Sequence, residues 1–173
     1  MTYIDFDDVI MDTYLAVFGD YQKEDATGQF ISDIEHVKNK DWHQALKEST
    51  IISDSINIIK NLDINTTCIL TKVHSLTNEG SNKIKFLREN GVMCPIILVP
   101  HDLKKTDVVN AKGNTLIDDS IFNLDAWSSS GGTAIFFSKN NNDTDGWGIK
   151  NTKYQKVTNL EFLKNKEYKE NEI

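Results

Sequence analysis

Two groups of aspartates in this chain each follow a short apolar run, and their residue types and spacing could support chemistry. Asp5, Asp7 and Asp8 follow the first run, and Asp118 and Asp119 end another run much later in the chain. Carboxylates brought this close together repel one another unless a cation offsets their charge. Oxygen ligands of this kind suit Mg²⁺, which also takes substrate phosphate as a ligand. The aspartates therefore suggest a metal-assisted phosphoryl-transfer site, provided that the two groups meet.

The elements that must position these aspartates are short apolar runs that alternate with helical patterns. We expect strands at residues 2–5, 66–71, 95–100, 114–118 and 133–137, with a last strand and helix after residue 153. Strands that are apolar throughout indicate a parallel sheet covered by helices on both faces, so the expected fold class is α/β and Rossmann-like. Ligands bind outside the carboxyl ends of such strands. Both acidic groups and Thr71 end strands, and the two groups should lie side by side at one edge.

The segment after the first strand is too long for a plain crossover helix. From Tyr14 to about residue 62 the pattern is helical and without strands, and Tyr14, Val17, Phe18 and Tyr21 recur at helical spacing. We therefore expect a small helical cap at residues 13–62, inserted into an α/β core made of residues 1–12 and 63–173.

Composition limits the partners that this protein can have. The formal net charge of -7 argues against a nucleic acid polymer, because phosphate contacts along a duplex need clustered lysines and arginines. No apolar run approaches the length of a membrane span, so no membrane partner is expected. The chain shows no signal-peptide pattern, and Cys68 and Cys94 do not make a disulfide framework, so cytoplasm is the simplest compartment. The oligomeric state stays open, and a homodimer is among the options.

The order of these motifs resembles that of the haloacid dehalogenase (HAD) superfamily of phosphotransferases. "DFDDVIMD" is similar to the family's first motif, in which Asp-x-Asp follows the first strand. Thr71 after the second strand, a lysine after the third and an aspartate pair after the fourth arrive in the family's order. The most similar branch is the 5'(3')-deoxyribonucleotidases. Asp12 matches the extended first motif of that branch, and Lys105–Thr106, "LIDDSIFNLDAW" and "GGTAIFF" resemble its later segments. The resemblance implies a HAD core and a small phosphorylated substrate, in that branch a nucleoside monophosphate.

Carried over from the family, the first acidic group would perform the catalysis. Asp5 would attack phosphorus and form an aspartyl-phosphate. Asp7 would protonate the leaving alcohol and then act as base for the water that hydrolyses the intermediate. The resemblance also implies Mg²⁺, held by Asp5, the backbone carbonyl of Asp7 and the second acidic pair, with Asp119 as the direct ligand and Asp118 as its support.

The phosphate-binding residues implied by the resemblance lie after the second and third strands. Thr71 would hydrogen-bond the phosphoryl group, Lys105 would neutralise its charge, and Lys72 beside Thr71 belongs to the same set. Lys104 rivals Lys105, because the segment before Asp118 is longer than in the nucleotidase branch. The family usually has glycine where this chain has Asp8, and aspartate tolerates unusual backbone angles better than most residues.

Several residues have two readings. Phe18, Phe30 and Trp42, together with Tyr14, could stack on a nucleobase, but aromatic residues at helical spacing also suit a core. Asp12 could act in the site or simply cap the following helix.

Other functions remain open beside a nucleotidase. The substrate could be another small phosphomonoester, such as a sugar or metabolite phosphate. The chain could instead bind a phosphorylated ligand without turning it over, or act as a receiver-like module. The motif order argues against a receiver, whose phospho-accepting aspartate lies in the middle of the chain, and the presence of Asp7 argues for turnover.

Overall fold

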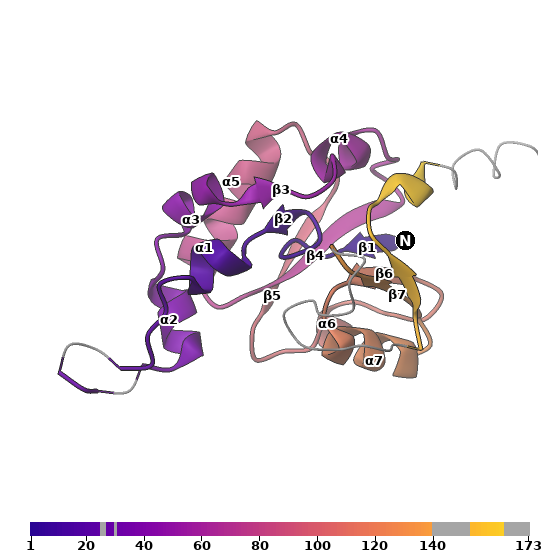
Figure 1. The fold of residues 1–173 in the computed structure, drawn as a ribbon. Coiled ribbons are helices and arrows are strands. Elements are labelled where there is room, and N and C mark those ends of the chain that lie inside the picture. Colours follow the sequence, from indigo (N-terminus) through magenta and orange to yellow (C-terminus); the bar gives the residue numbers. More distant parts are fainter. Residues whose placement is uncertain (25–26, 30, 140–152, 165–173) are drawn as a thin grey trace, which may run out of the picture.

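Six parallel strands form one sheet in the computed structural model, which describes residues 1–24, 27–29, 31–139 and 153–164 (Figure 1). The order across the sheet is β5-β4-β1-β6-β7-β8, and every neighbouring pair is parallel. The strands are β1 (Thr2–Ile4), β4 (Thr67–Val73), β5 (Ile96–Pro100), β6 (Thr115–Asp118), β7 (Thr133–Phe137) and β8 (Gln155–Val157). The expected α/β fold with a parallel sheet is confirmed.

Helices cover both faces of the sheet, which explains why its strands are apolar throughout. Tyr3 and Leu116 pack on one face against Trp127 of α7 (Ile121–Ser129). Their chain neighbours Ile4 and Ile117 share the other cluster with Leu87 and the residues of α4. Figure 1 accordingly shows α4 (Ser55–Lys60) and α5 (Ser81–Glu89) on one side, and α6 (Lys105–Val108) and α7 on the other.

The segment between β1 and β4 is mostly helical, as expected, but it is not free of strands. It contains α1 (Tyr14–Phe18), α2 (Asp33–Asn39), α3 (Trp42–Glu48) and α4. The expectation of a strand-free segment is wrong, because β3 (Thr50–Ile51) pairs antiparallel with β2 (Met11–Asp12). Each of these strands has only two residues, too few for a pattern of alternation to be visible in the sequence.

The helices of this segment pack into the main core. Val17 of α1, Val37 of α2 and Trp42 of α3 belong to the same buried cluster as Ile4 and Ile69 in the sheet. The side chain of Ser32 accepts a hydrogen bond from the backbone N–H of Glu35 at the start of α2, and Asp41 does the same for Gln44 at the start of α3. The division into a cap at residues 13–62 and a core stays a prediction.

Two other elements differ from expectation in their extent. β4 continues to Val73 and so passes Thr71 by two residues. The expected last helix is a short 3₁₀ turn at Glu161–Leu163. A π-helical turn at Leu76–Gly80 leads into α5. In the part of the chain that the structure describes, no helix is both long and apolar enough to cross a membrane.

Candidate active site

The two acidic groups meet at the carboxyl edge of the sheet. β1 and β6 are neighbours in parallel register, and the backbone N–H of Asp5 donates to the carbonyl of Ile117 over 3.0 Å. This register places Asp5, just after β1, beside Asp118 and Asp119. One carboxylate oxygen from each of the three aspartates lies within 4.8 Å of the others. The expected juxtaposition of the two groups is therefore present.

A buried lysine lies between the two groups. The ammonium of Lys105, the first residue of α6, is 2.8 Å from Oδ1 of Asp5 and 2.6 Å from Oδ2 of Asp118. Burial alone would lower the pKa of Lys105, but Asp118 and Asp5 raise it, so that the lysine stays charged. Lys104 is exposed at the N-terminal end of α6. The structure therefore brings Lys105, rather than Lys104, to the carboxylates.

The two aspartates of the second group have different surroundings. Asp118 is fully buried and accepts hydrogen bonds from Lys105, the backbone N–H of Ser120 and Nδ2 of Asn123. Asp119 is half-buried, and no hydrogen bond or ion pair holds its side chain among the described residues. Burial, reinforced by the charges of Asp118 and Asp5, raises the pKa of Asp119 well above its usual range. Asp118 thus has protein partners for its carboxylate, and the roles predicted for Asp118 as support and Asp119 as metal ligand remain predictions.

The Asp5 carboxylate also has unused coordinating capacity. Among the described residues, its buried Oδ1 has the ammonium of Lys105 2.8 Å away as its ion-pair partner and accepts no hydrogen bond of good geometry. Burial, together with Asp118 and Asp7, outweighs the attraction of Lys105 and raises the pKa of Asp5 from 3.8 to about 7. Three carboxylates that repel one another, with one lysine between them, favour a further cation here. Asp5 and Asp119, with Asp118 behind them, therefore fit an oxygen-ligated Mg²⁺.

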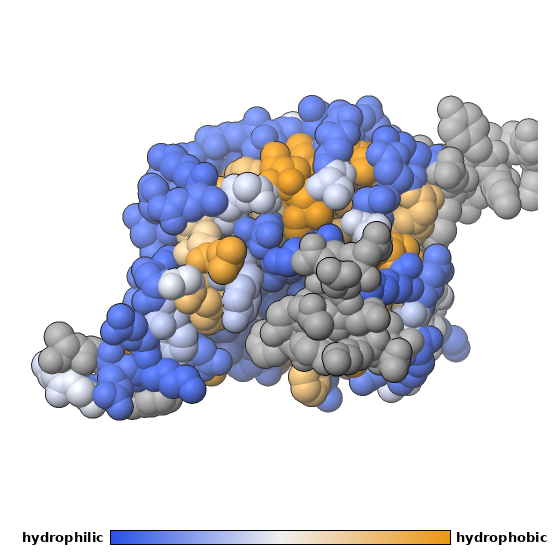
Figure 2. Space-filling model, in the orientation of Figure 1, coloured by the Kyte–Doolittle hydropathy of each residue, from blue (hydrophilic) through white to orange (hydrophobic). Residues whose placement is uncertain are grey.

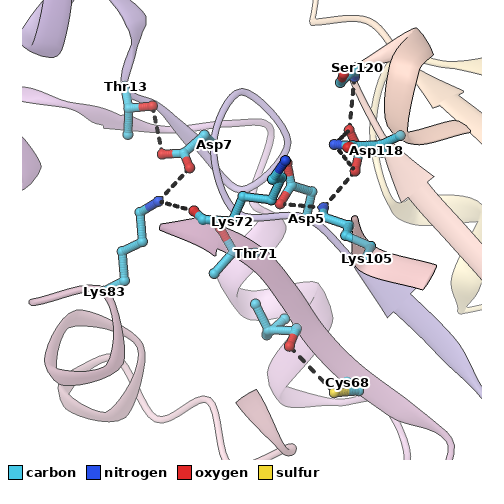
Figure 3. A network of polar contacts seen from close by, with 12 residues as sticks. Asp5, Asp7, Thr13, Cys68, Thr71, Lys72, Lys83, Lys105, Asp118 and Ser120 are labelled. Atoms are coloured by element: carbon cyan, nitrogen blue, oxygen red, sulfur yellow. Dashed lines mark hydrogen bonds and ion pairs between the residues drawn. The ribbon is translucent and has the colours of Figure 1, made fainter. Parts of the chain in front are cut away.

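Asp7 lies apart from this acidic cluster and has its own partners. Oγ1 of Thr13 donates to Oδ1 of Asp7 over 2.9 Å, and Nζ of Lys83 donates to Oδ2 over 2.5 Å. Figure 3 shows Asp7 with Thr13 and Lys83 on one side of Asp5, and Lys105 with Asp118 on the other. The sequence analysis missed Lys83. Its only signal was a glutamate four residues earlier, a spacing that usually marks an exposed helix pair.

Asp8 adopts the left-handed conformation for which glycine is usual, with a φ of 53°. Nζ of Lys139 donates to Oδ1 of Asp8 over 3.1 Å and to Oδ1 of Asp12 over 2.7 Å. Burial raises the pKa of Asp8 to about 6 in spite of Lys139. The capping role considered for Asp12 is wrong, because Thr13 is the N-cap residue of α1. Lys139 was not expected in the site at all.

The predicted phosphate-binding residues occupy different positions along β4. Thr71 is fully buried, and its hydroxyl makes a 3.3 Å hydrogen bond to the carbonyl of Lys72. The half-buried Lys72 lines a hollow of about 510 Å³ together with Lys104, Lys105 and Thr106. Lys105 thus lies between this hollow and the carboxylates. The phosphate-binding roles of Thr71, Lys72 and Lys105 remain predictions.

A second cavity, of about 380 Å³, lies beside the acidic residues. Asp7, Asp8 and Asp119 form part of its wall, and the rest is largely apolar and aromatic, including Tyr14, Val17, Phe18, Trp42, Ile121 and Phe122. Figure 2 shows hydrophobic surface over α1 and over the β2–β3 pair within a mostly hydrophilic face.

The aromatic residues of this cavity differ in how freely a ligand can reach them. Phe18 is half-buried in the wall, as the stacking hypothesis requires. Trp42 is only 2% exposed, and its indole N–H donates to the carbonyl of Val37, so it is mainly a core residue. Phe30 lies outside the described residues. Phe122 is 86% exposed at the cavity, and the sequence analysis did not single it out.

Comparisons with solved structures agree with this architecture. D,D-heptose 1,7-bisphosphate phosphatase from Burkholderia thailandensis is similar over 95% of this chain and 96% of its own, with a TM-score of 0.55 and 14% identity. The B. bronchiseptica enzyme of the same name, complexed with magnesium and phosphate, covers 98% of both chains, with a TM-score of 0.53 and 14% identity. A haloacid dehalogenase-like hydrolase from Streptococcus pneumoniae covers 95% of this chain and 96% of its own, with a TM-score of 0.56 and 14% identity.

These comparisons define the fold of the chain. Its α/β fold is similar to the folds of these neighbours, which include proteins described as HAD-superfamily or haloacid dehalogenase-like hydrolases. No family model and no curated protein sequence matches the chain. The structural neighbours named above include two phosphatases.

Proposed function

We propose that the chain is a Mg²⁺-dependent phosphomonoester hydrolase that works through an aspartyl-phosphate on Asp5. The observation that carries this proposal is the Asp5 carboxylate itself. It is buried at the carboxyl edge of the sheet, has an oxygen without a hydrogen bond, and lies between a buried lysine and a second acidic pair. Such an oxygen can attack phosphorus while the surrounding charges hold a phosphoryl group in place.

In the first step, an oxygen of Asp5 bonds to phosphorus as the bond to the leaving oxygen breaks. Asp7, in its protonated form, gives its proton to that oxygen, so the alcohol leaves neutral. In the second step, the carboxylate of Asp7 takes a proton from water as the water oxygen bonds to phosphorus. The bond to Asp5 then breaks, which releases phosphate and regenerates both aspartates.

The remaining residues of the site would bind the metal and stabilise the negative charge of the phosphoryl group during these steps. Asp5 and Asp119 would ligate Mg²⁺ with the backbone carbonyl of Asp7, and Asp118 would orient this group through Lys105 and Asn123. When bound, the metal offsets the charge of the carboxylates and of the phosphoryl oxygens. Lys105 adds a second positive charge 2.8 Å from Asp5. A structural neighbour that binds magnesium and phosphate supports this assignment.

Within this activity, we infer that the substrate is a small nucleoside monophosphate. The supporting observation is the cavity beside Asp7 and Asp119, whose wall includes the aromatic residues Tyr14, Phe18 and Phe122. The resemblance of the first and later motifs to deoxyribonucleotidases points the same way. A sugar phosphate is the second candidate, because two structural neighbours are heptose bisphosphate phosphatases. The same wall also contains Asp33, His74 and Ser120, which could hydrogen-bond a sugar, so the substrate panel must compare the two classes directly.

The test is phosphate release from 5'- and 3'-(deoxy)nucleoside monophosphates, sugar phosphates and an aryl phosphate, with Mg²⁺ or with a chelator. We expect release that requires the metal, is lost in Asp5→Asn, and persists in Asp102→Asn, a matched change at an exposed aspartate. Faster release from sugar phosphates than from nucleotides would overturn the substrate assignment alone. If Mg²⁺ binds but no phosphate is released from any substrate, the enzymatic function would be overturned, and the chain would instead be a protein that binds a phosphorylated ligand.

A further inference from the structure

Lys83 of α5 places a charged group in the interior next to the proposed active site. The residue is fully buried, and its ammonium donates to Oδ2 of Asp7 and, over 2.6 Å, to Oε1 of Glu79. The same ammonium lies 4.8 Å from the ring centre of Trp42 and 5.3 Å from that of Phe6. Lys83 therefore contacts α3, the loop after β1 and the turn before α5.

Such a lysine is costly for the fold. Burial by itself would lower the pKa of Lys83, but Asp7 and Glu79 raise it, so the side chain stays charged in the interior. Burial likewise opposes ionisation of Glu79, yet Lys83 and His74 lower its pKa. Buried ion pairs are often no more stabilising than apolar side chains of the same volume. The position of Lys83 therefore calls for a role beyond stability.

The partner of Lys83 suggests that role. Both oxygens of Asp7 are held, one by Thr13 and one by Lys83, while the side chain is still 31% exposed in the wall of the cavity. A carboxyl group fixed at both oxygens presents its proton in one direction.

We propose that Lys83 is a positioning residue for Asp7, whose carboxyl group it orients toward the leaving oxygen. This inference rests on the proposed hydrolase function. The proton passes from Asp7 to the leaving oxygen as the phosphorus–oxygen bond breaks, and Lys83 keeps its own protons throughout. Glu79 anchors the ammonium from the opposite side, and the ring of Trp42 covers it.

The test uses leaving groups of similar size but different basicity: p-nitrophenyl, phenyl and benzyl phosphate. A good leaving group departs without a proton, whereas benzyl alcohol needs one. We measure kcat/KM, which reports the first irreversible step, for the wild type, Lys83→Met and Lys85→Met. Lys85 is an exposed lysine on the same helix and serves as the matched control.

We expect Lys83→Met to lower kcat/KM for benzyl phosphate by on the order of 10- to 100-fold, but for p-nitrophenyl phosphate by less than about threefold. In an Asp7→Asn background the same change should have no further selective effect, because Lys83 acts through Asp7. If Lys83→Met does not fold, Lys83→Gln serves in its place: it keeps a hydrogen-bond donor without the charge and should show the same direction of selectivity with a smaller loss on benzyl phosphate.

If kcat/KM falls equally for all three esters in a folded variant, the proposal is overturned, and the role of Lys83 is structural. A selective loss that persists without Asp7 would overturn it as well. A wild type inactive on every ester would instead refute the hydrolase function on which the proposal rests.

Discussion

Replacing Asp5 by asparagine should stabilise the metal-free protein while it abolishes phosphate release. The Asp5 carboxylate is buried close to Asp118 and Asp119, and among the residues that the structure describes only Lys105 offsets its charge. Asparagine has nearly the same shape, removes one negative charge, and leaves the pair between Lys105 and Asp118 intact. The expected gain in stability therefore comes from the same electrostatic repulsion that prepares the site for a cation.

The size of this gain follows from the pKa of Asp5, which burial raises from 3.8 to about 7. Each pKa unit corresponds to about 1.4 kcal/mol, so ionised Asp5 costs the folded state up to about 4 kcal/mol. An acid whose folded pKa is raised imposes no cost below its unfolded pKa. The cost grows as the pH rises from about 4 to about 7 and is constant above that range. The gap between variant and wild type should therefore be about 2 kcal/mol near pH 5 and about 4 kcal/mol near pH 8.

Thermal and urea denaturation in the presence of a chelator would measure this gap. For a chain of this size, about 4 kcal/mol corresponds to a difference in Tm on the order of 10 °C. Saturating Mg²⁺ should narrow the gap, because it binds the wild-type site more tightly and stabilises the state that binds it. Asp102→Asn, at an exposed aspartate, should show no gap that changes with pH.

A less stable Asp5→Asn variant near pH 8 without metal would refute this reasoning, because Lys105 would then more than compensate the charge of Asp5. A gap of equal size at both pH values would also refute it, since the effect could not arise from ionisation.

Three further changes test other parts of the site. Mg²⁺ should raise the Tm of the wild type, and Asp119→Asn should abolish most of that rise, as differential scanning fluorimetry over a Mg²⁺ series would show. Lys105→Met should abolish phosphate release. It should also lower the free energy of unfolding measured with urea by about 3–5 kcal/mol, because Asp5 and Asp118 lose their shared cation. Lys104→Met, at an exposed position, is the control and should leave both nearly unchanged. Phe122→Ala should change stability by no more than about 0.5 kcal/mol, since Phe122 is 86% exposed, but should raise KM for nucleoside monophosphates in steady-state assays. An unchanged KM would mean that Phe122 does not contact the substrate.

The sheet was predictable because each of its main strands is a buried apolar run. Ile69 and Ile117, for example, lie in strands covered on both faces, and such strands need no alternation of polarity to be recognised. The pairing of β2 with β3 was not predictable, because two residues per strand carry no periodic signal. The end of β4 was placed too early for a similar reason, since Lys72 interrupts the apolar pattern although the strand continues through it.

In the site, the placement of residues that directly follow strands could be predicted, and that of residues from helices could not. Asp5 and Asp118 meet because parallel register brings strand ends together. Lys83 and Lys139 reach Asp7 and Asp8 across contacts between residues far apart in the chain. A lysine within a helix or a loop has the same local sequence signal whether it is exposed or buried against an aspartate.

The packing of α3 onto Lys83 has a consequence for the size of molecule that this protein can process. Trp42 belongs to the same buried cluster as the strands of the sheet and also covers the ammonium that holds Asp7. If α3 moved away, the ring of Trp42 would no longer cover the buried ammonium of Lys83. Helix α3 is therefore poorly suited to act as a moving lid. If the proposed function holds, we expect the cavity of about 380 Å³ beside Asp7 to keep the wall that α3 gives it and to favour small phosphorylated molecules.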